Sequence, residues 1–217
     1  MTETKDLKRK DLLNNPLNVK GYIFLDRDGV IIEDRHYIKD PNDVNLIEGV
    51  NDFFDYISSR AFGVIIVTNQ SGISRGFFSW DHYEKITHEM LNQINNIDYI
   101  LGIYANGYSH TVDISKRSDL ETWRKPGFGM LKQAICDFDI KIEKTILAGD
   151  RYTDVLAGIH AGIHKCFHVK TGKGNKERVK VDKLLAKCKS DENENGQIIK
   201  IDKLSDMFRF IDEGIPE

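Results

Sequence analysis

The polar residues best suited to chemistry stand at the ends of apolar runs. A run ending at Leu25 is followed by two aspartates one residue apart, and a run ending at Val67 is followed by a hydroxyl and two amides. Four polar segments of this kind are Asp26–Gly29, Thr68–Gly72, Trp123–Pro126 and Gly149–Arg151. Each residue alone suits a strand end or a helix cap. If the runs are parallel strands, however, the segments meet at one edge of a sheet, where such sheets bind ligands.

Three carboxylates are expected to meet at that edge. Asp26 and Asp28 leave the same strand, and Asp150 leaves a neighbouring one. Such a group repels itself unless a cation lies among the acids, and hard oxygen ligands suit Mg²⁺. One carboxylate can then attack phosphorus, while a second carboxyl exchanges a proton with the leaving oxygen and with water.

Hydrogen-bond donors and a fixed positive charge complete this chemistry. Thr68 and Asn69 offer donors to phosphoryl oxygens, and Lys125 supplies the charge. Because uncatalysed hydrolysis of phosphate monoesters is extremely slow, most of the catalysis has to come from electrostatic positioning. The residue types therefore indicate phosphoryl transfer.

Alternating strands and helices are predicted to position these groups. Runs that are apolar throughout are typical of strands covered on both faces, and apolar stripes with helical spacing separate them. The expected strands are residues 22–25, 64–67, 97–105, 145–148, 166–169 and 198–201, and the expected helices are 50–57, 83–94, 130–138 and 153–161. Residues 170–189 are basic and weakly periodic, and we interpret them as solvated surface. The pattern predicts an α/β fold with a doubly wound parallel sheet.

Composition limits the class of protein. The chain has 217 residues, of which 40% are hydrophobic, which is enough for one core. Its net charge of −3 does not favour nucleic acid or a membrane surface as a partner. The three cysteines are odd in number and widely spaced, as expected in a reducing compartment. There is no apolar signal core at the start and no apolar run near the roughly 20 residues of a membrane span. We expect a cytoplasmic globular protein, with an extension at residues 1–18 and a single domain at 19–217.

The four motifs together resemble those of the haloacid-dehalogenase-like phosphatases, in family order across residues 22–163. The resemblance implies a Rossmann-like fold in which Asp26 is the nucleophile and Asp28 the general acid and base. Thr68 and Lys125 would stabilise the phosphoryl group. Asp26, the backbone carbonyl of Asp28, and Asp150 would hold Mg²⁺.

Longer stretches are similar to one family within this class. Val67–Gly76, Arg124–Pro126 and Gly149–Arg151 resemble the D-glycero-D-manno-heptose 1,7-bisphosphate phosphatases and their histidinol-phosphate phosphatase relatives. The resemblance implies removal of the 7-phosphate from a small phosphorylated sugar. The implied substrate-binding residues are Asp34, Arg35, His36, Tyr37, Asn69, Gln70, Ser71, Arg124 and Arg151.

The chain departs from this family in one loop. The family usually carries a small zinc loop before the Arg-Lys-Pro segment, but no cysteine lies between residues 98 and 125. We therefore expect no zinc here. The connections 28–49 and 104–124 are too short to hold a folded cap domain, so we expect a capless enzyme with an open site.

Three other functions fit parts of the sequence. Histidinol-phosphate phosphatase shares the same motifs. Polynucleotide 3′-phosphatases share a Thr-Asn-Gln run and the pattern of Arg124–Met130, although the net charge opposes a nucleic-acid partner. A non-enzymatic phospho-acceptor domain also gathers Asp, Thr and Lys at strand ends, but it has no need of an acid at position 28. We expect a monomer that acts on a small phosphorylated metabolite, with neither a membrane nor a nucleic acid as partner.

Overall fold

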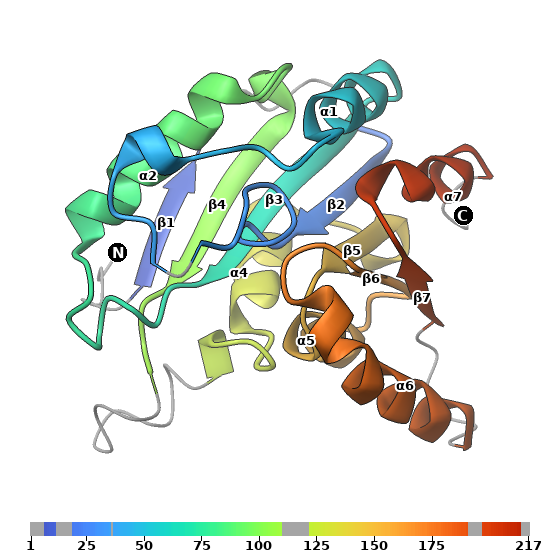
Figure 1. Ribbon diagram of the computed structural model, residues 1–217. Coiled ribbons are helices and arrows are strands. Elements are labelled where there is room, and N and C mark those ends of the chain that lie inside the picture. Colours follow the sequence, from blue (N-terminus) through green and yellow to red (C-terminus); the bar gives the residue numbers. More distant parts are fainter. Residues whose placement is uncertain (1–6, 12–18, 36, 110–121, 191–196, 214–217) are drawn as a thin grey trace.

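One sheet organises the molecule. The computed structural model describes residues 7–11, 19–35, 37–109, 122–190 and 197–213. Seven strands of this part pair in the order β1-β4-β3-β2-β5-β6-β7 (Figure 1). They are β1 (Leu7–Asp11), β2 (Gly21–Leu25), β3 (Phe62–Asn69), β4 (Ile100–Asn106), β5 (Thr145–Gly149), β6 (Lys165–Val169) and β7 (Gln197–Ile201). Strands β2 to β7 run parallel, and only β1 is antiparallel to its neighbour β4. The predicted parallel sheet is confirmed.

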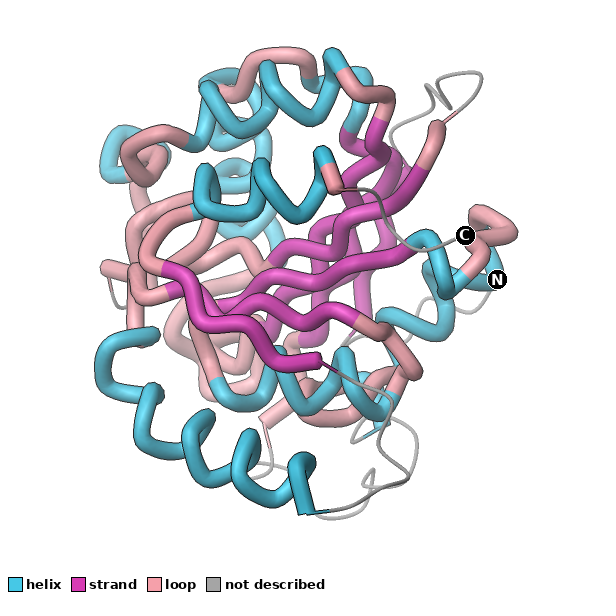
Figure 2. Tube along the Cα trace, turned by 90° about the vertical axis from the view of Figure 1, so that its right-hand side faces the viewer, coloured by secondary structure: helices cyan, strands magenta, loops and turns pink. Residues whose placement is uncertain are grey.

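Helices cover both faces of the sheet (Figure 2). One core cluster joins the sheet to α1 (Val50–Ser59), α2 (Trp80–Gln93) and α7 (Phe208–Asp212). The other joins it to α4 (Gly129–Asp137), α5 (Tyr152–His160) and α6 (Gly174–Ser190). Four single turns of 3₁₀ helix lie at Pro41–Asp43, Ile97–Tyr99, Ile142–Lys144 and Leu204–Met207.

The two core clusters explain why the strands are apolar throughout. In β2, Ile23 and Leu25 pack into the cluster with α1 and α2, while Phe24 between them packs into the cluster with α4 and α5. This is the period of two that a strand imposes on its side chains. The predicted stripe of α1 is confirmed as well, because Phe53 and Ile57 are fully buried.

Three elements differ from the expectation. Residues 7–11 of the predicted N-terminal extension form β1, whose charged sequence gives no apolar run; the domain boundary at residue 19 stays a prediction. Ile97–Tyr99, expected to begin a strand, forms a 3₁₀ turn ahead of β4. The basic segment forms α6, whose Val181 and Leu184 are buried while Lys176, Lys180 and Lys183 remain exposed.

The long connections stay small. Between β2 and α1 the chain forms only the 3₁₀ turn Pro41–Asp43 and isolated bridges, so no cap domain is inserted there. The connection from β4 to α4 includes residues 110–121, which lie outside the described residues. No helix in the described part is long and apolar enough to cross a membrane.

Candidate active site

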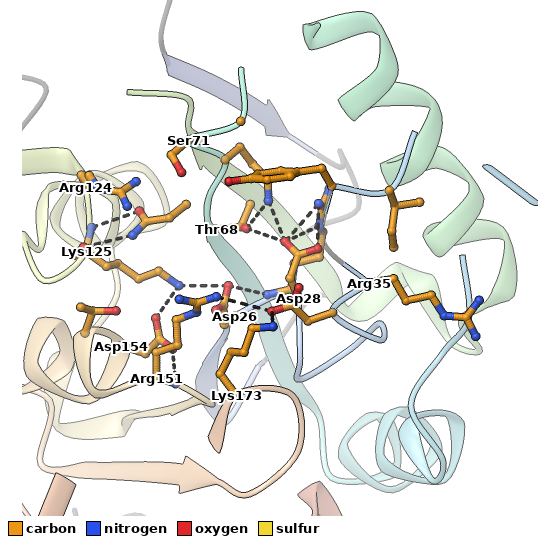
Figure 3. A pocket seen from close by; sticks show the side chains of 18 of the residues that line it. Asp26, Asp28, Arg35, Thr68, Ser71, Arg124, Lys125, Arg151, Asp154 and Lys173 are labelled. Atoms are coloured by element: carbon orange, nitrogen blue, oxygen red, sulfur yellow. Dashed lines mark hydrogen bonds and ion pairs between the residues drawn. The ribbon is translucent and has the colours of Figure 1, made fainter. Parts of the chain in front are cut away.

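A cavity of about 390 Å³ opens at the carboxyl ends of β2 and β3 (Figure 3). Strand β2 is followed along the chain by β3 on one side, while β5 lies on its other side, so the cavity is at the topological switch point of the sheet. The lining residues are Asp26, Arg27, Asp28, Asp34, Arg35, Tyr37, Ile38, Thr68, Asn69, Gln70, Ser71, Gly72, Arg75, Phe78, Arg124, Lys125, Arg151, Thr153, Asp154 and Lys173. The prediction that these strand ends share one site is confirmed.

A lysine and three aspartates form the buried floor of the cavity. The Lys125 ammonium lies 3.0 Å from Asp26 Oδ1 and 2.7 Å from Asp154 Oδ1, and it donates to the carbonyl oxygen of Val67 at 2.8 Å. One oxygen from each of Asp26, Asp150 and Asp154 lies within 4.8 Å of the others. The floor thus carries three carboxylates against one ammonium.

Burial and mutual repulsion disfavour ionisation of this cluster. Burial raises the pKa of Asp26 to about 7, against the opposing effect of Lys125, and Asp154 adds to the rise. Burial likewise raises the pKa of Asp150 to about 8, with Asp26 and Asp154 contributing. Desolvation lowers the pKa of Lys125, but Asp154 and Asp26 outweigh it, so the net shift is upward and the ammonium is retained. The single ammonium therefore does not balance the charge that the three carboxylates would carry if all were ionised.

The donor set fits a hard divalent cation. Asp150 Oδ2 accepts a hydrogen bond of 2.6 Å from the backbone N–H of Lys173, whereas its buried Oδ1 has no hydrogen-bond partner among the described residues. A buried, unpartnered carboxylate oxygen is costly unless something positive lies beside it. Three carboxylates fit Mg²⁺, which binds oxygen ligands and takes only a few of those ligands from protein side chains.

Asp28 points away from this cluster. Its carboxylate accepts from Arg27 Nη2 at 3.0 and 3.1 Å, and its Oδ2 also accepts from Gln70 at 2.7 Å and Thr68 at 3.3 Å. Burial raises the pKa of Asp28, but the Arg27 guanidinium outweighs burial and holds the pKa below its ordinary value. Its side chain is therefore ionised and separate from the cation cluster, and a ligand role for its backbone carbonyl stays a prediction.

Arg27 is itself fixed from α2. The guanidinium is buried, donates to Thr87 Oγ1 at 3.3 Å and lies 5.0 Å from the ring centre of Tyr83. This contact with the aromatic face favours a desolvated cation. Helix α2 therefore positions Asp28 through Arg27.

Asn69 fixes the backbone of Lys125. Its Nδ2 donates to the Lys125 carbonyl at 3.0 Å, and its Oδ1 accepts from the Lys125 N–H at 3.1 Å. Asn69 ends β3, directly after Thr68. Strand β3 therefore supplies the hydroxyl of Thr68 and, through Asn69, fixes the position of the Lys125 backbone.

Guanidinium groups surround the mouth of the cavity. Arg75, Arg124 and Arg151 line it, and Figure 3 shows the side chains of Arg124 and Arg151 among those of the pocket. Burial lowers the pKa of Arg124, and the like charges of Arg75 and Arg151 lower it further. A bound anion would relieve this repulsion. Arg35 points outward and pairs with Glu33 at 2.6 Å.

The predicted site residues fall into three groups. Twelve of the fourteen predicted site residues line the cavity; Asp150 belongs to the carboxylate cluster of the floor but is not among the lining residues, and His36 is outside the described residues. Gln70, expected to contact substrate, lines the cavity and donates to Asp28 and to Thr68, and its contact with substrate stays a prediction. The prediction that zinc is absent concerns a stretch largely outside the described residues and stays a prediction.

Sequence reasoning assigned no role to four charged residues that line the cavity: Arg27, Arg75, Asp154 and Lys173. Asp154 was visible four residues after Asp150, but a position in the first turn of a helix is an ordinary place for an acid. Arg75 and Lys173 lie in loops and only the fold brings them to the cavity. Their charge alone could have suggested a role in anion binding.

Known proteins resemble this chain in sequence and in fold. The family model of HAD-hydrolase-like proteins matches residues 122–189. The D-glycero-beta-D-manno-heptose-1,7-bisphosphate 7-phosphatase of Haemophilus ducreyi is 33% identical over 161 residues, 71% of this chain and 85% of the relative. The enzyme of that name from Haemophilus influenzae is 36% identical over 152 residues, 70% and 82% of the two chains. The D-glycero-alpha-D-manno-heptose-1,7-bisphosphate 7-phosphatase of Photorhabdus laumondii is 34% identical over 151 residues, 69% and 82%.

Solved structures agree with the fold. A putative HAD-like phosphatase from Mesorhizobium loti superposes with a TM-score of 0.77 at 22% identity, over 100% of this chain and 98% of that one. A D,D-heptose 1,7-bisphosphate phosphatase from B. bronchiseptica, complexed with magnesium and phosphate, gives 0.72 at 22% identity, over 89% and 98%.

The sheet, the aspartate floor and these similarities define a haloacid-dehalogenase-like phosphatase, a hydrolase of phosphate monoesters. Within that class the chain belongs to the family of the D-glycero-D-manno-heptose 1,7-bisphosphate phosphatases. The resemblance inferred from the motifs is confirmed.

Proposed function

We propose that this protein removes the 7-phosphate of a D-glycero-D-manno-heptose 1,7-bisphosphate, with Mg²⁺ as cofactor and Asp26 as nucleophile. The observation that carries the proposal is one cavity with two centres that could each bind a phosphate, the floor by way of Lys125 and a bound cation, and the mouth by way of its arginines. Lys125 lies among the aspartates of the floor, and Arg75, Arg124 and Arg151 surround the mouth. A bisphosphate presents one phosphate to each centre.

The residues of the floor account for the attack. An oxygen of Asp26 bonds to phosphorus as the bond from phosphorus to the sugar oxygen breaks. Asp28, which is ionised in the free protein, takes up a proton from water when the substrate binds and gives that proton to the leaving oxygen. Lys125 and Thr68 donate to the phosphoryl oxygens as negative charge develops there. Asp26, Asp150 and Asp154 would hold Mg²⁺, which would neutralise negative charge at the same point.

The second step releases phosphate. Water attacks the phosphoryl group on Asp26, whose carboxylate leaves, and Asp28 takes the proton of the water. Arg27 stabilises the ionised Asp28 that the first step leaves behind and that this second step requires. The acid at position 28 therefore favours turnover over a stable phospho-acceptor.

The test compares substrates on one preparation. We expect kcat/KM for the α- or β-heptose 1,7-bisphosphate to exceed that for histidinol phosphate and for a 3′-phosphorylated oligonucleotide by about a hundredfold or more, since unpaired charges at the mouth cost several kcal/mol. EDTA should abolish the release of phosphate and Mg²⁺ should restore it. A preference for histidinol phosphate or for the oligonucleotide would replace the proposed substrate, and equal, feeble rates on all four would refute it.

A further inference from the structure

A short loop outside the four motifs contacts both the cation cluster and the substrate side of the cavity. This loop, Thr171–Lys173, follows β6 and packs against the turn after β2; we call it the clamp loop. Thr171 Oγ1 donates to the carbonyl oxygen of Gly29 at 2.6 Å. The backbone N–H of Lys173 donates to Asp150 Oδ2, also at 2.6 Å. The loop is thus bonded to the turn of the first motif and to the aspartate of the fourth.

Two glycines allow this close approach. Gly29 and Gly172 have φ angles of +87° and +56°, which favour glycine. A Cβ atom on either one would collide with Asp150 Oδ2. The two glycine backbones therefore pack against each other and against this oxygen, and only glycine leaves room for it.

The side chain of Lys173 reaches in the other direction. Its ammonium lies 3.3 Å from Asp34 Oδ2, and Arg151 Nη2 lies 3.4 Å from the same oxygen. The Asp34 side chain is 13% exposed and lines the cavity together with Lys173. Two cations thus hold Asp34 on the substrate side.

We propose that the clamp loop positions two carboxylates at once, Asp150 toward the cation and Asp34 toward the substrate, and that Lys173 is the positioning residue common to both. The backbone N–H occupies Oδ2 of Asp150 and leaves the buried Oδ1 to the cation. Partners of this kind orient metal ligands in many sites. The part concerning Asp34 rests on the proposed function, whereas the part concerning Asp150 does not.

The first arm of the test measures Mg²⁺ binding by isothermal titration calorimetry. We expect Gly172→Ala and Thr171→Val to weaken binding about 10- to 100-fold, as loss of the hydrogen bonds that orient a metal ligand does in other proteins. Lys173→Met keeps the backbone N–H that donates to Asp150 and removes a positive charge. Its affinity for Mg²⁺ should therefore be no weaker than that of the wild type. Circular dichroism checks folding, and Thr171→Val decides the matter if Gly172→Ala does not fold. Wild-type affinity in the folded variants overturns the positioning of Asp150.

The second arm measures steady-state kinetics. Lys173→Met should raise KM for the heptose bisphosphate about fivefold to tenfold, because a half-buried ion pair is lost, and should raise KM for p-nitrophenyl phosphate by less. Lys176→Met, an exposed lysine one turn along the chain, is the matched control and should match the wild type in both. An unchanged KM for the bisphosphate in Lys173→Met overturns the role of Asp34.

The two arms separate failure of this inference from failure of the proposed function. A wild-type protein that leaves the heptose bisphosphate intact contradicts the proposed function alone, and the Mg²⁺ titrations still decide the role of the loop at Asp150. In that case a double-mutant cycle of Lys173→Met with Asp34→Asn, read from urea unfolding, decides the second contact. A coupling free energy of zero between the two substitutions overturns the contact between Lys173 and Asp34.

Discussion

Protons should compete with Mg²⁺ for the carboxylates of Asp26 and Asp150. In the metal-free protein, burial and neighbouring carboxylates raise the pKa of Asp26 to about 7 and that of Asp150 to about 8. A carboxylate ligand must lose its proton before it binds a cation, so lowering the pH weakens binding and binding releases protons. The perturbation is therefore simply a change of pH between 6 and 8.

The size of the effect follows from the two pKa values. At pH 6 both carboxyls are largely protonated, and the apparent Kd for Mg²⁺ should exceed its limiting value by about a thousandfold. At pH 7 the factor is about 20 and at pH 8 about 2, so the apparent Kd falls about 50-fold over the first pH unit and about tenfold over the second. Binding should release about two protons at pH 6 and fewer than one at pH 8.

Calorimetry in buffers of different ionisation enthalpy measures both the Kd and the protons released. Asp26→Asn removes one titrating ligand and should reduce the release at pH 6 to about one proton. Asp202→Asn, whose side chain is 72% exposed and lies outside the floor, is the matched control and should behave as the wild type does. An apparent Kd that changes less than threefold between pH 6 and pH 8 would refute the assignment of these carboxylates to the cation.

Three further predictions concern activity and stability. Asp26→Asn should lower phosphate release from any substrate about a thousandfold or more while circular dichroism stays unchanged; a smaller loss would exclude Asp26 as nucleophile. Arg124→Met should raise KM about tenfold for the bisphosphate but not for p-nitrophenyl phosphate, and equal rises would place the arginine elsewhere in the reaction. In EDTA the Tm should fall as pH rises through 7 and 8, because the raised pKa values of Asp26 and Asp150 stabilise the folded protein only while they are protonated; Mg²⁺ should reverse the fall, and a Tm that rises over this range contradicts the shifts.

The sequence predicted the centre of the fold better than its edges. Central strands such as β2 and β3 are covered on both faces, so burial leaves an apolar run that is easy to recognise. Strand β1 lies at the edge, and its sequence Leu-Lys-Arg-Lys-Asp has one apolar residue, which no pattern of burial distinguishes from a charged linker. Helix α6 escaped prediction for a similar reason, because most of its surface is solvated.

The site was predictable as a set of residues but not as a geometry. Motif order brought Asp26, Thr68 and Lys125 together correctly. The spacing of Asp26 and Asp28 suggested that both carboxylates face the cation, but Arg27 draws Asp28 aside. The position of Arg27 depends on its contacts with Tyr83 and Thr87, which are far away in sequence. Only the fold therefore reveals the orientation of Asp28.

The paired amide of Asn69 has a consequence for how this family can vary. Because both the N–H and the carbonyl of Lys125 are bonded to a side chain at the end of β3, the lysine takes its position from the sheet and not from the connection that precedes it. The stretch between β4 and Arg124 can then differ in length and composition without displacing this lysine. Relatives that differ in this connection can therefore keep the lysine in the same place.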